Sequence, residues 1–337
     1  KQMANLRNSS IELLRIVAIL LIVMMHSAGY GIASADTGTR IGVIAINSVG
    51  NMGVTIFILI SGYFGIHFRP SKLIKLWAMM LVYSVGIFIF DIIQGNIDFS
   101  AGGLYKAVTP VTSVKWWFMT CYIILFCLSP LVNRIVNTLT QSEMLWLLGV
   151  LAFFFVISPT ILRHTITDDN FGKGLPNFFL AYLIGQYIRK YELPEKVERH
   201  ATTIFVVCVL LLFGISSGLI FSGEETHLLL CRDNDLFIIV GAISLFIAFK
   251  NKQFHNRTVN YCAGFAFPIY LINIPILKML HTQYTFSGNR IEWAAYIVSF
   301  IEIVAIAVVA ELVRRVIFDK PVEWAGRIAD KKFTSAK

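Results

Sequence analysis

The stretch ELLRIVAILLIVMMHSAG, residues 12–29, is long and apolar enough to cross a lipid bilayer, yet it carries an arginine and a histidine. A helix needs roughly 20 mostly apolar residues to span the hydrocarbon core. Ionisable side chains are costly in that core and commonly mark functional sites there. The stretch therefore predicts a first transmembrane helix, and it raises the question of what Arg15 and His26 do in it.

The composition of the whole chain also predicts a membrane protein. Of the 337 residues, 56% are hydrophobic and 15% are charged, and the mean hydropathy is +0.70. A soluble domain is nearer half apolar and a quarter charged. Strict alternation with period two, typical of a β-barrel, is absent. The ten predicted spans are about 12–33, 49–66, 73–94, 116–136, 143–161, 175–189, 201–221, 235–249, 262–282 and 291–314.

The loop charges predict the orientation of these spans. With a cytoplasmic N-terminus, twenty of the 29 Lys and Arg residues fall in cytoplasmic segments and seven in outer segments. Cytoplasmic loops of membrane proteins carry such an excess. We therefore expect an all-α integral membrane protein, a bundle of about ten transmembrane helices with both termini cytoplasmic. It would form a single domain over 1–337, with spans within about 12–314, a short cytoplasmic tail at 315–337 and no appended soluble domain.

Two classes of function are disfavoured by the pattern of charged and metal-ligating residues. The net charge of +9 follows the membrane topology, and no basic face interleaved with aromatic residues suggests nucleic-acid binding. No group of Cys, His, Asp and Glu has the spacing of metal ligands. We expect neither a nucleic-acid partner nor a metal site.

Helix geometry places Arg15 and His26 on one face of the first span. Eleven residues at 100° each amount to three turns plus about 20°, with a rise of roughly 16 Å. Glu12 lies three residues before Arg15 and can pair with its guanidinium, which lowers the cost of burying the charge. With the N-terminus inside, Arg15 lies near the cytoplasmic boundary and His26 beyond the midplane.

The two residue types favour a group-transfer reaction. The planar guanidinium of arginine binds phosphate through paired hydrogen bonds, and histidine is the commonest general base. One helix face would thus offer an anion anchor on the inner side and a proton acceptor further out. The alternatives are that Arg15 only snorkels to lipid headgroups and that His26 is a satisfied packing residue. Of the seven histidines, His26 alone lies well inside a predicted span.

Several short motifs resemble the bacterial membrane acyltransferase-3 family, which includes O-acetyltransferases of surface polysaccharides. Arg15 and His26 match the family's R-x10-H spacing. The run GNMGVTIFILISGYFGI, residues 50–66, resembles its second span, and KWWFMTCYIILFCLSPLVN, residues 115–133, resembles its W-F…Y…S-P helix. FAFPIYLINIPIL, residues 265–277, resembles its Y-L-I-H-x-P segment, with Asn273 where the family usually has His. The resemblance covers about residues 8–318.

The resemblance implies an O-acyltransferase, which transfers groups other than aminoacyl groups. The donor would be acetyl-CoA or another acyl-CoA, used as a substrate with no bound cofactor. The acceptor would be a hydroxyl of a cell-surface glycan or a lipid-linked sugar precursor, at the bacterial cytoplasmic membrane. The protein would be a multi-pass protein surrounded by membrane lipids.

The resemblance also implies roles for particular residues. His26 would be the catalytic base, and Asn273 would hydrogen-bond at the site. Donor binding or positioning would involve Arg15, Glu12, Arg69, Lys72 and Lys75. Supporting residues would be Ser61, Gly62, Tyr63, Trp117, Tyr122 and Asn273. We add Glu302, in the middle of the tenth span, because an acidic residue inside the membrane usually has a function.

Purely structural roles are alternatives for several of these residues. Gly62 and the other small residues of the second span also suit close helix packing. Trp117 also suits the aromatic belt at a membrane interface. Glu302 also suits a structural ion or hydrogen-bond partner.

Two other functions would use the same membrane fold. A transporter or flippase of a small molecule or glycan would need polar residues along a continuous path and would not depend on acyl-CoA. A non-catalytic scaffold in a glycan assembly complex would tolerate alanine at Arg15 and His26.

Overall fold

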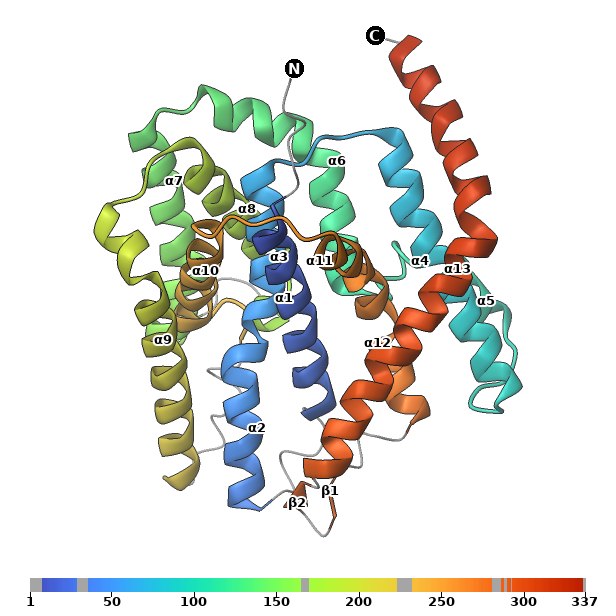
Figure 1. Ribbon diagram of the computed structural model, residues 1–337, viewed down its shortest axis with the longest axis horizontal. Helices are drawn as coiled ribbons and strands as arrows, with labels where there is room; N and C mark the ends of the chain where they lie inside the picture. Colours follow the sequence, from blue (N-terminus) through green and yellow to red (C-terminus); the bar gives the residue numbers. More distant parts are fainter. Residues whose placement is uncertain are drawn as a thin grey trace.

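The protein is a bundle of helices (Figure 1). The computed structural model describes residues 8–28, 36–164, 170–222, 232–280, 286–287, 290–291 and 293–335. The first half contains α1 (Ser9–Ala28), α2 (Thr37–Gly50), α3 (Met52–Phe64), α4 (Pro70–Ile93), α5 (Ala101–Val108), α6 (Trp117–Thr138), α7 (Gln141–Ala152) and the π-helix η2 (Phe153–Leu162). The second half contains the short η3 (Asn170–Gly172), α8 (Leu175–Lys190), α9 (Glu195–Phe221), α10 (Leu236–Lys250), α11 (Arg257–Cys262), η5 (Ala263–Phe265), α12 (Ala266–Met279) and α13 (Trp293–Ser335).

The predicted all-α class is confirmed for the described residues, whose strands are only a two-residue antiparallel pair, β1 (Phe286–Ser287) and β2 (Arg290–Ile291). Each predicted span overlaps helix among its described residues. Eight helical segments of the described chain are long and apolar enough to cross a membrane, and the apolar α10 is shorter. α8 has 16 residues, fewer than a full span needs. The count of ten spans therefore stays a prediction.

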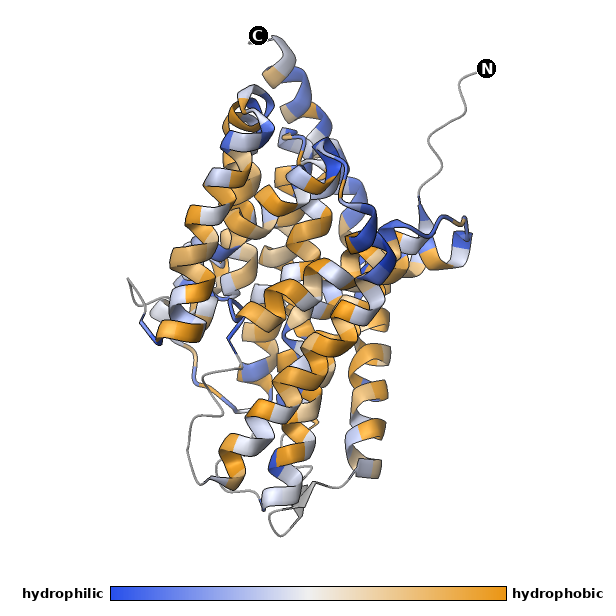
Figure 2. Cartoon of the chain, turned by 90° about the vertical axis from the view of Figure 1, so that its left-hand side faces the viewer, coloured by the Kyte–Doolittle hydropathy of each residue, from blue (hydrophilic) through white to orange (hydrophobic). Residues whose placement is uncertain are grey.

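The outer surface of the bundle suits lipid. Large apolar side chains are exposed along α9 and α13, where Leu210 is 62% and Ile301 is 59% exposed. Figure 2 shows hydrophobic residues along most of the long helices and hydrophilic residues gathered toward the end where α13 finishes. α1 begins and α13 ends at the same end of the bundle (Figure 1). Which membrane side that end faces stays a prediction.

Helices also lie outside the predicted spans, among them α5, most of α2 and the end of α13. The segment before residue 49, predicted as an outer connection, contains α2, which starts where the Asp36 side chain caps the N–H groups of Gly38 and Thr39. The tail over 315–335, predicted to be short, continues α13 as one helix. This tail is fastened to the start of α4, because the Asp330 carboxylate accepts the Ser71 N–H at 2.9 Å.

α3 is the central helix, and glycines at its contacts let the neighbouring helices approach closely. It packs most extensively against α8. A methyl group at Gly62 would collide with the carbonyl oxygen of Tyr182, and one at Gly185 would collide with that of Leu59. Small residues permit such contact between helix backbones. Gly62 therefore has the alternative role considered above, close packing between helices.

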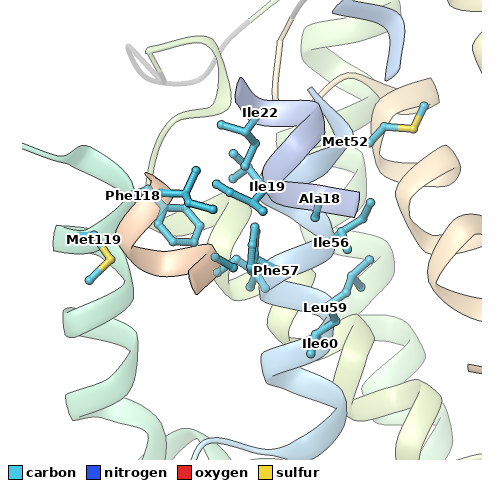
Figure 3. Packing of buried hydrophobic residues seen from close by; sticks show 14 of the residues in the cluster. Ala18, Ile19, Ile22, Met52, Ile56, Phe57, Leu59, Ile60, Phe118 and Met119 are labelled. Carbon is cyan, nitrogen blue, oxygen red and sulfur yellow. The ribbon is translucent and has the colours of Figure 1, made fainter. Parts of the chain in front are cut away.

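α1 lies against the α2–α3 pair in a similar way. A Cβ atom at Gly53 would lie 2.6 Å from the Ala18 carbonyl oxygen, and one at Gly50 would lie 2.7 Å from Met25 Cβ. Figure 3 shows the buried side chains around this contact, with Ala18 and Ile22 of α1 beside Ile56 and Phe57 of α3. The small residues thus place the polar face of α1 against the middle of the bundle.

Replacing Gly62 with alanine is expected to destabilise the protein. The added methyl group overpacks the α3–α8 contact, which typically costs about 1–3 kcal/mol. Gly214→Ala on α9 is the matched control, since a Cβ atom there meets nothing within 4 Å. Thermal unfolding in detergent should show a lower Tm for Gly62→Ala and no loss for Gly214→Ala. Equal Tm values for Gly62→Ala and the wild type would refute the packing role.

Candidate active site

His26 and Asn273 form a hydrogen-bonded pair between α1 and α12. His26 Nδ1 lies 2.7 Å from Asn273 Oδ1, near the last turn of α1. Asn273 is 1% exposed. The Tyr296 hydroxyl of α13 donates to the Met24 carbonyl at 2.9 Å and fixes the same end of α1. Residues from three helices therefore hold the imidazole in place.

The amide of Asn273 determines which nitrogen of His26 carries the proton. Its Nδ2 donates to the carbonyl oxygens of Ile269 at 3.1 Å and Tyr270 at 2.6 Å. The amide oxygen therefore faces His26, and an amide oxygen can only accept. The neutral imidazole must then hold its proton on Nδ1, which leaves the Nε2 lone pair available as a base.

A proline and a tryptophan support the turn of α12 that carries Asn273. Pro275 has no N–H, so it cannot bond the Leu271 carbonyl as a helical residue would. The Trp116 indole Nε1–H donates to that carbonyl at 2.9 Å instead. The side chain thus satisfies the carbonyl that the proline leaves without its helical donor.

Arg15 and Glu12 form the predicted ion pair on α1. Arg15 Nη1 lies 3.0 Å and 3.2 Å from the two Glu12 carboxylate oxygens. The Glu12 side chain is 4% exposed and that of Arg15 is 27% exposed, so part of the guanidinium remains accessible. No described residue hydrogen-bonds the other guanidinium N–H groups of Arg15.

The space between Arg15 and His26 is closed by apolar side chains. A cavity of about 10 Å³ remains there, lined by Ile22, Phe57, Phe118, Ala266, Phe267 and Tyr270. Figure 3 shows Phe118 against Ile19 and Ile22 of α1 and near Phe57 of α3. This volume is barely enough for one water molecule. A ligand that reaches from one residue to the other would have to displace aromatic rings.

Three of the predicted supporting residues, Tyr122, Ser61 and Trp117, lie beside this closed region. The Tyr122 ring stacks on Phe118 with a centroid distance of 6.2 Å, and its hydroxyl lies near Ser61 and within electrostatic range of Arg15. Ser61 itself donates to the Phe57 carbonyl at 2.9 Å. Trp117 meets Phe118 edge-on at 6.1 Å. Tyr63 lies further along α3, where its ring packs on Phe246 of α10.

The structure does not bring the other predicted residues to the pair. Glu302 lies on the exposed face of α13. The three basic residues Arg69, Lys72 and Lys75 are exposed at the start of α4, beside the end of α13. In the described part of the chain, no group of three or more His, Cys, Asp and Glu could hold a metal ion; the metal-free expectation stays a prediction.

Comparison with protein families decides the assignment of the chain. The family model described as an acyltransferase domain, of the acyltransferase-3 type, matches residues 8–312. The chain belongs to the acyltransferase-3 family. The resemblance expected from the motifs is thereby confirmed. No curated protein and no solved structure matched the chain. The helices and the family together make it a multi-pass membrane acyltransferase.

Two charged groups near the pair of this acyltransferase were missed by sequence reasoning, which took them for outer-loop residues. Lys173 is exposed and lies within electrostatic range of both His26 and Asp233. Asp233 is 3% exposed, and its Oδ2 has no hydrogen-bond partner. The segments that carry them touch, because the Asp233 N–H donates to the Phe171 carbonyl at 2.9 Å. Two connecting segments thus bring charges toward the active end of α1.

A second missed acid is Glu311, 1% exposed on α13. Its carboxylate accepts the Tyr83 hydroxyl at 2.7 Å, the Arg314 Nε–H at 2.7 Å and the Arg315 Nε–H at 2.6 Å. Arg315 also donates to the Gly264 carbonyl at 2.8 Å. This network ties α13 to α4 and to η5, so its role is structural.

The Asp233 carboxyl is expected to make stability depend on pH. Burial raises its pKa from 3.8 to about 7, and the charge of Lys173 opposes the rise. The folded protein then binds the proton more tightly than the unfolded chain, so stability is lost as the pH rises from about 4 to about 7. Asp233→Asn removes this loss and should raise the free energy of unfolding at pH 8 by up to about 4 kcal/mol.

Thermal unfolding in detergent at pH 5 and pH 8 measures this effect. The Tm difference between Asp233→Asn and the wild type should be larger at pH 8 than at pH 5. The exposed Asp98→Asn variant is the control and should follow the wild type at both values. A gain for Asp233→Asn that is the same at both pH values would contradict the assignment.

Proposed function

We propose that the protein transfers an acyl group, in the first place acetyl, from cytoplasmic acyl-CoA to a hydroxyl of a cell-surface glycan or lipid-linked sugar at the bacterial cytoplasmic membrane. The observation that carries the proposal is the His26–Asn273 pair, which leaves Nε2 as a free base on the helix that also carries Arg15. Membership of the acyltransferase-3 family supports the reaction class.

The donor binds from the Arg15 side in this proposal. The N–H groups of the Arg15 guanidinium that do not bond Glu12 hold phosphate oxygens of the CoA nucleotide. The pantetheine arm then extends toward His26 along α1. Because Phe118, Phe267 and their neighbours close this path, donor binding must move aromatic rings apart. The exposed Arg69, Lys72 and Lys75 would attract the phosphates from the cytoplasm.

Acyl transfer follows from the position of Nε2. His26 Nε2 takes the proton of the acceptor hydroxyl as its oxygen attacks the thioester carbonyl. The tetrahedral intermediate collapses, the carbon–sulfur bond breaks, and the imidazolium returns the proton to the CoA thiolate. The Asn273 carbonyl stabilises the imidazolium through the Nδ1–H bond. The Lys173 ammonium would favour the negative charge that develops on the carbonyl oxygen.

The apolar character of the region supports transfer over transport. A transporter needs polar groups along a continuous path, whereas apolar and aromatic side chains separate Arg15 from His26. Donor-dependent acylation by purified, reconstituted protein distinguishes the two functions, because a transporter would show no dependence on acyl-CoA.

His26→Ala should abolish most acyl transfer. Loss of a general base typically lowers the rate about 10²–10⁴-fold. The measurement is incorporation of radioactive acetyl from acetyl-CoA into the envelope fraction by reconstituted protein. His200→Ala, at an exposed histidine of α9, is the control and should retain full activity. Undiminished incorporation by a correctly folded His26→Ala protein would remove the mechanism.

Asn273→Leu should lower kcat while leaving the KM for the donor unchanged. Leucine cannot accept the Nδ1–H bond, so the imidazole loses its orientation and its preferred tautomer. We expect a loss of roughly ten- to hundredfold, part of what the base contributes. Asn137→Leu, at an exposed asparagine of α6, serves as the control. If kcat were the same in Asn273→Leu and the wild type, Asn273 would have no part in positioning the base.

A further inference from the structure

A cavity of about 810 Å³ lies at the end of the bundle where α4 and α12 finish (Figure 1). Its walls come from the end of α4, the segment before α6 and the last turns of α12. A second cavity of about 460 Å³ shares Asp91, Ile97 and Lys115 with it. Volumes of 300–1,000 Å³ are typical of sites for small ligands.

The cavity adjoins the helix that holds the partner of His26. Ile274 and Pro275, which directly follow Asn273, line it. Trp116 also lines it, and its indole is fixed by the bond to the Leu271 carbonyl. A molecule in the cavity would therefore lie beside α12, at the His26 end of the bundle and away from Arg15.

The polar lining suits a molecule with many hydroxyl groups. Asp91, Gln94 and Asn96 offer carboxylate and amide groups, which can accept or donate hydrogen bonds to hydroxyls. Trp116 adds an aromatic surface, although it is 8% exposed before anything binds. Together these are groups that bind the polar edges and apolar faces of sugars.

The charges of the lining give it an excess of positive charge. Two ammonium groups, Lys115 and Lys278, face one carboxylate, Asp91. Lys115 Nζ donates to the Ser84 carbonyl at 3.1 Å and keeps further N–H groups. Lys278 is exposed and has no hydrogen bond or ion pair to any described residue. The second cavity adds Asp98 and Lys106, whose charges cancel.

We propose that this cavity binds the acceptor and that the acceptor is an acidic sugar unit. Its carboxylate or phosphate binds Lys278 and Lys115, and its hydroxyls bind Asp91 and the neighbouring amides. This inference rests on the proposed function, since it describes the acceptor of the same reaction. An uncharged sugar would leave the one excess positive charge of the lining uncompensated and would bind more weakly.

Binding of three probe sugars tests the inference. The full-length protein in phosphatidylcholine nanodiscs is titrated calorimetrically with D-glucuronate, D-glucose 1-phosphate and D-glucose. At least one acidic sugar should bind about tenfold more tightly than glucose, as expected for one charge-assisted hydrogen bond. Preference for glucuronate would indicate an acidic glycan, and preference for the phosphate would indicate a phosphate-linked sugar.

Lys278→Gln should weaken binding of the preferred acidic sugar about tenfold and leave binding of glucose unchanged. Lys320→Gln is the control. Lys320 is an exposed lysine of α13 that does not line the cavity, so this variant should bind like the wild type. Equal affinity for charged and uncharged sugars, no binding of any probe, or an unchanged dissociation constant in a folded Lys278→Gln protein would overturn the inference.

Comparing this titration, made without acyl-CoA, with acyl transfer by the same wild-type protein separates this inference from the proposed function. Binding without acyl transfer in the wild type would contradict the proposed function alone. Acyl transfer without selective binding of acidic sugars would contradict the inference alone.

Discussion

The hydrogen bond between His26 and Asn273 is the interaction on which the active end of this protein depends. It joins α1 to α12 and leaves one imidazole nitrogen free to accept a proton. In an apolar interior an unpaired polar group is costly, so a satisfied pair holds its geometry firmly. Pro275 and Trp116 maintain the turn that carries Asn273, and the small residues Gly50 and Gly53 let α1 pack closely enough to reach it.

The same close packing restricts how a long donor can reach the histidine. Arg15 and His26 share one helix face, yet the aromatic rings of α3, α6 and α12 fill the space between them. The closed arrangement leaves almost no free volume beside these rings in the absence of substrate. Entry of a pantetheine arm then requires side chains such as Phe118 and Phe267 to rotate, so donor binding and opening of the path are coupled steps.

Periodicity and motif spacing predicted most of the helices and the shared face of Arg15 and His26, because these depend on local geometry. They could not tell which intramembrane acid faces inward. Glu302 and Glu311 are nine residues apart, or 900° along the helix, so they lie on opposite faces; the earlier acid is exposed and the later one is buried. Lys173 and Asp233 were missed because their approach to α1 depends on how two distant connecting segments pack together.

The central claim is that Asn273 fixes His26 with its proton on Nδ1, so that Nε2 is the base. Nitrogen-15 NMR of the histidine-labelled protein in lipid, with the His26 signal assigned by comparison with His26→Asn, measures this tautomer directly. The account predicts a protonated, hydrogen-bonded Nδ1 and an unprotonated Nε2 at neutral pH. A proton on Nε2 with an unprotonated Nδ1 would contradict it.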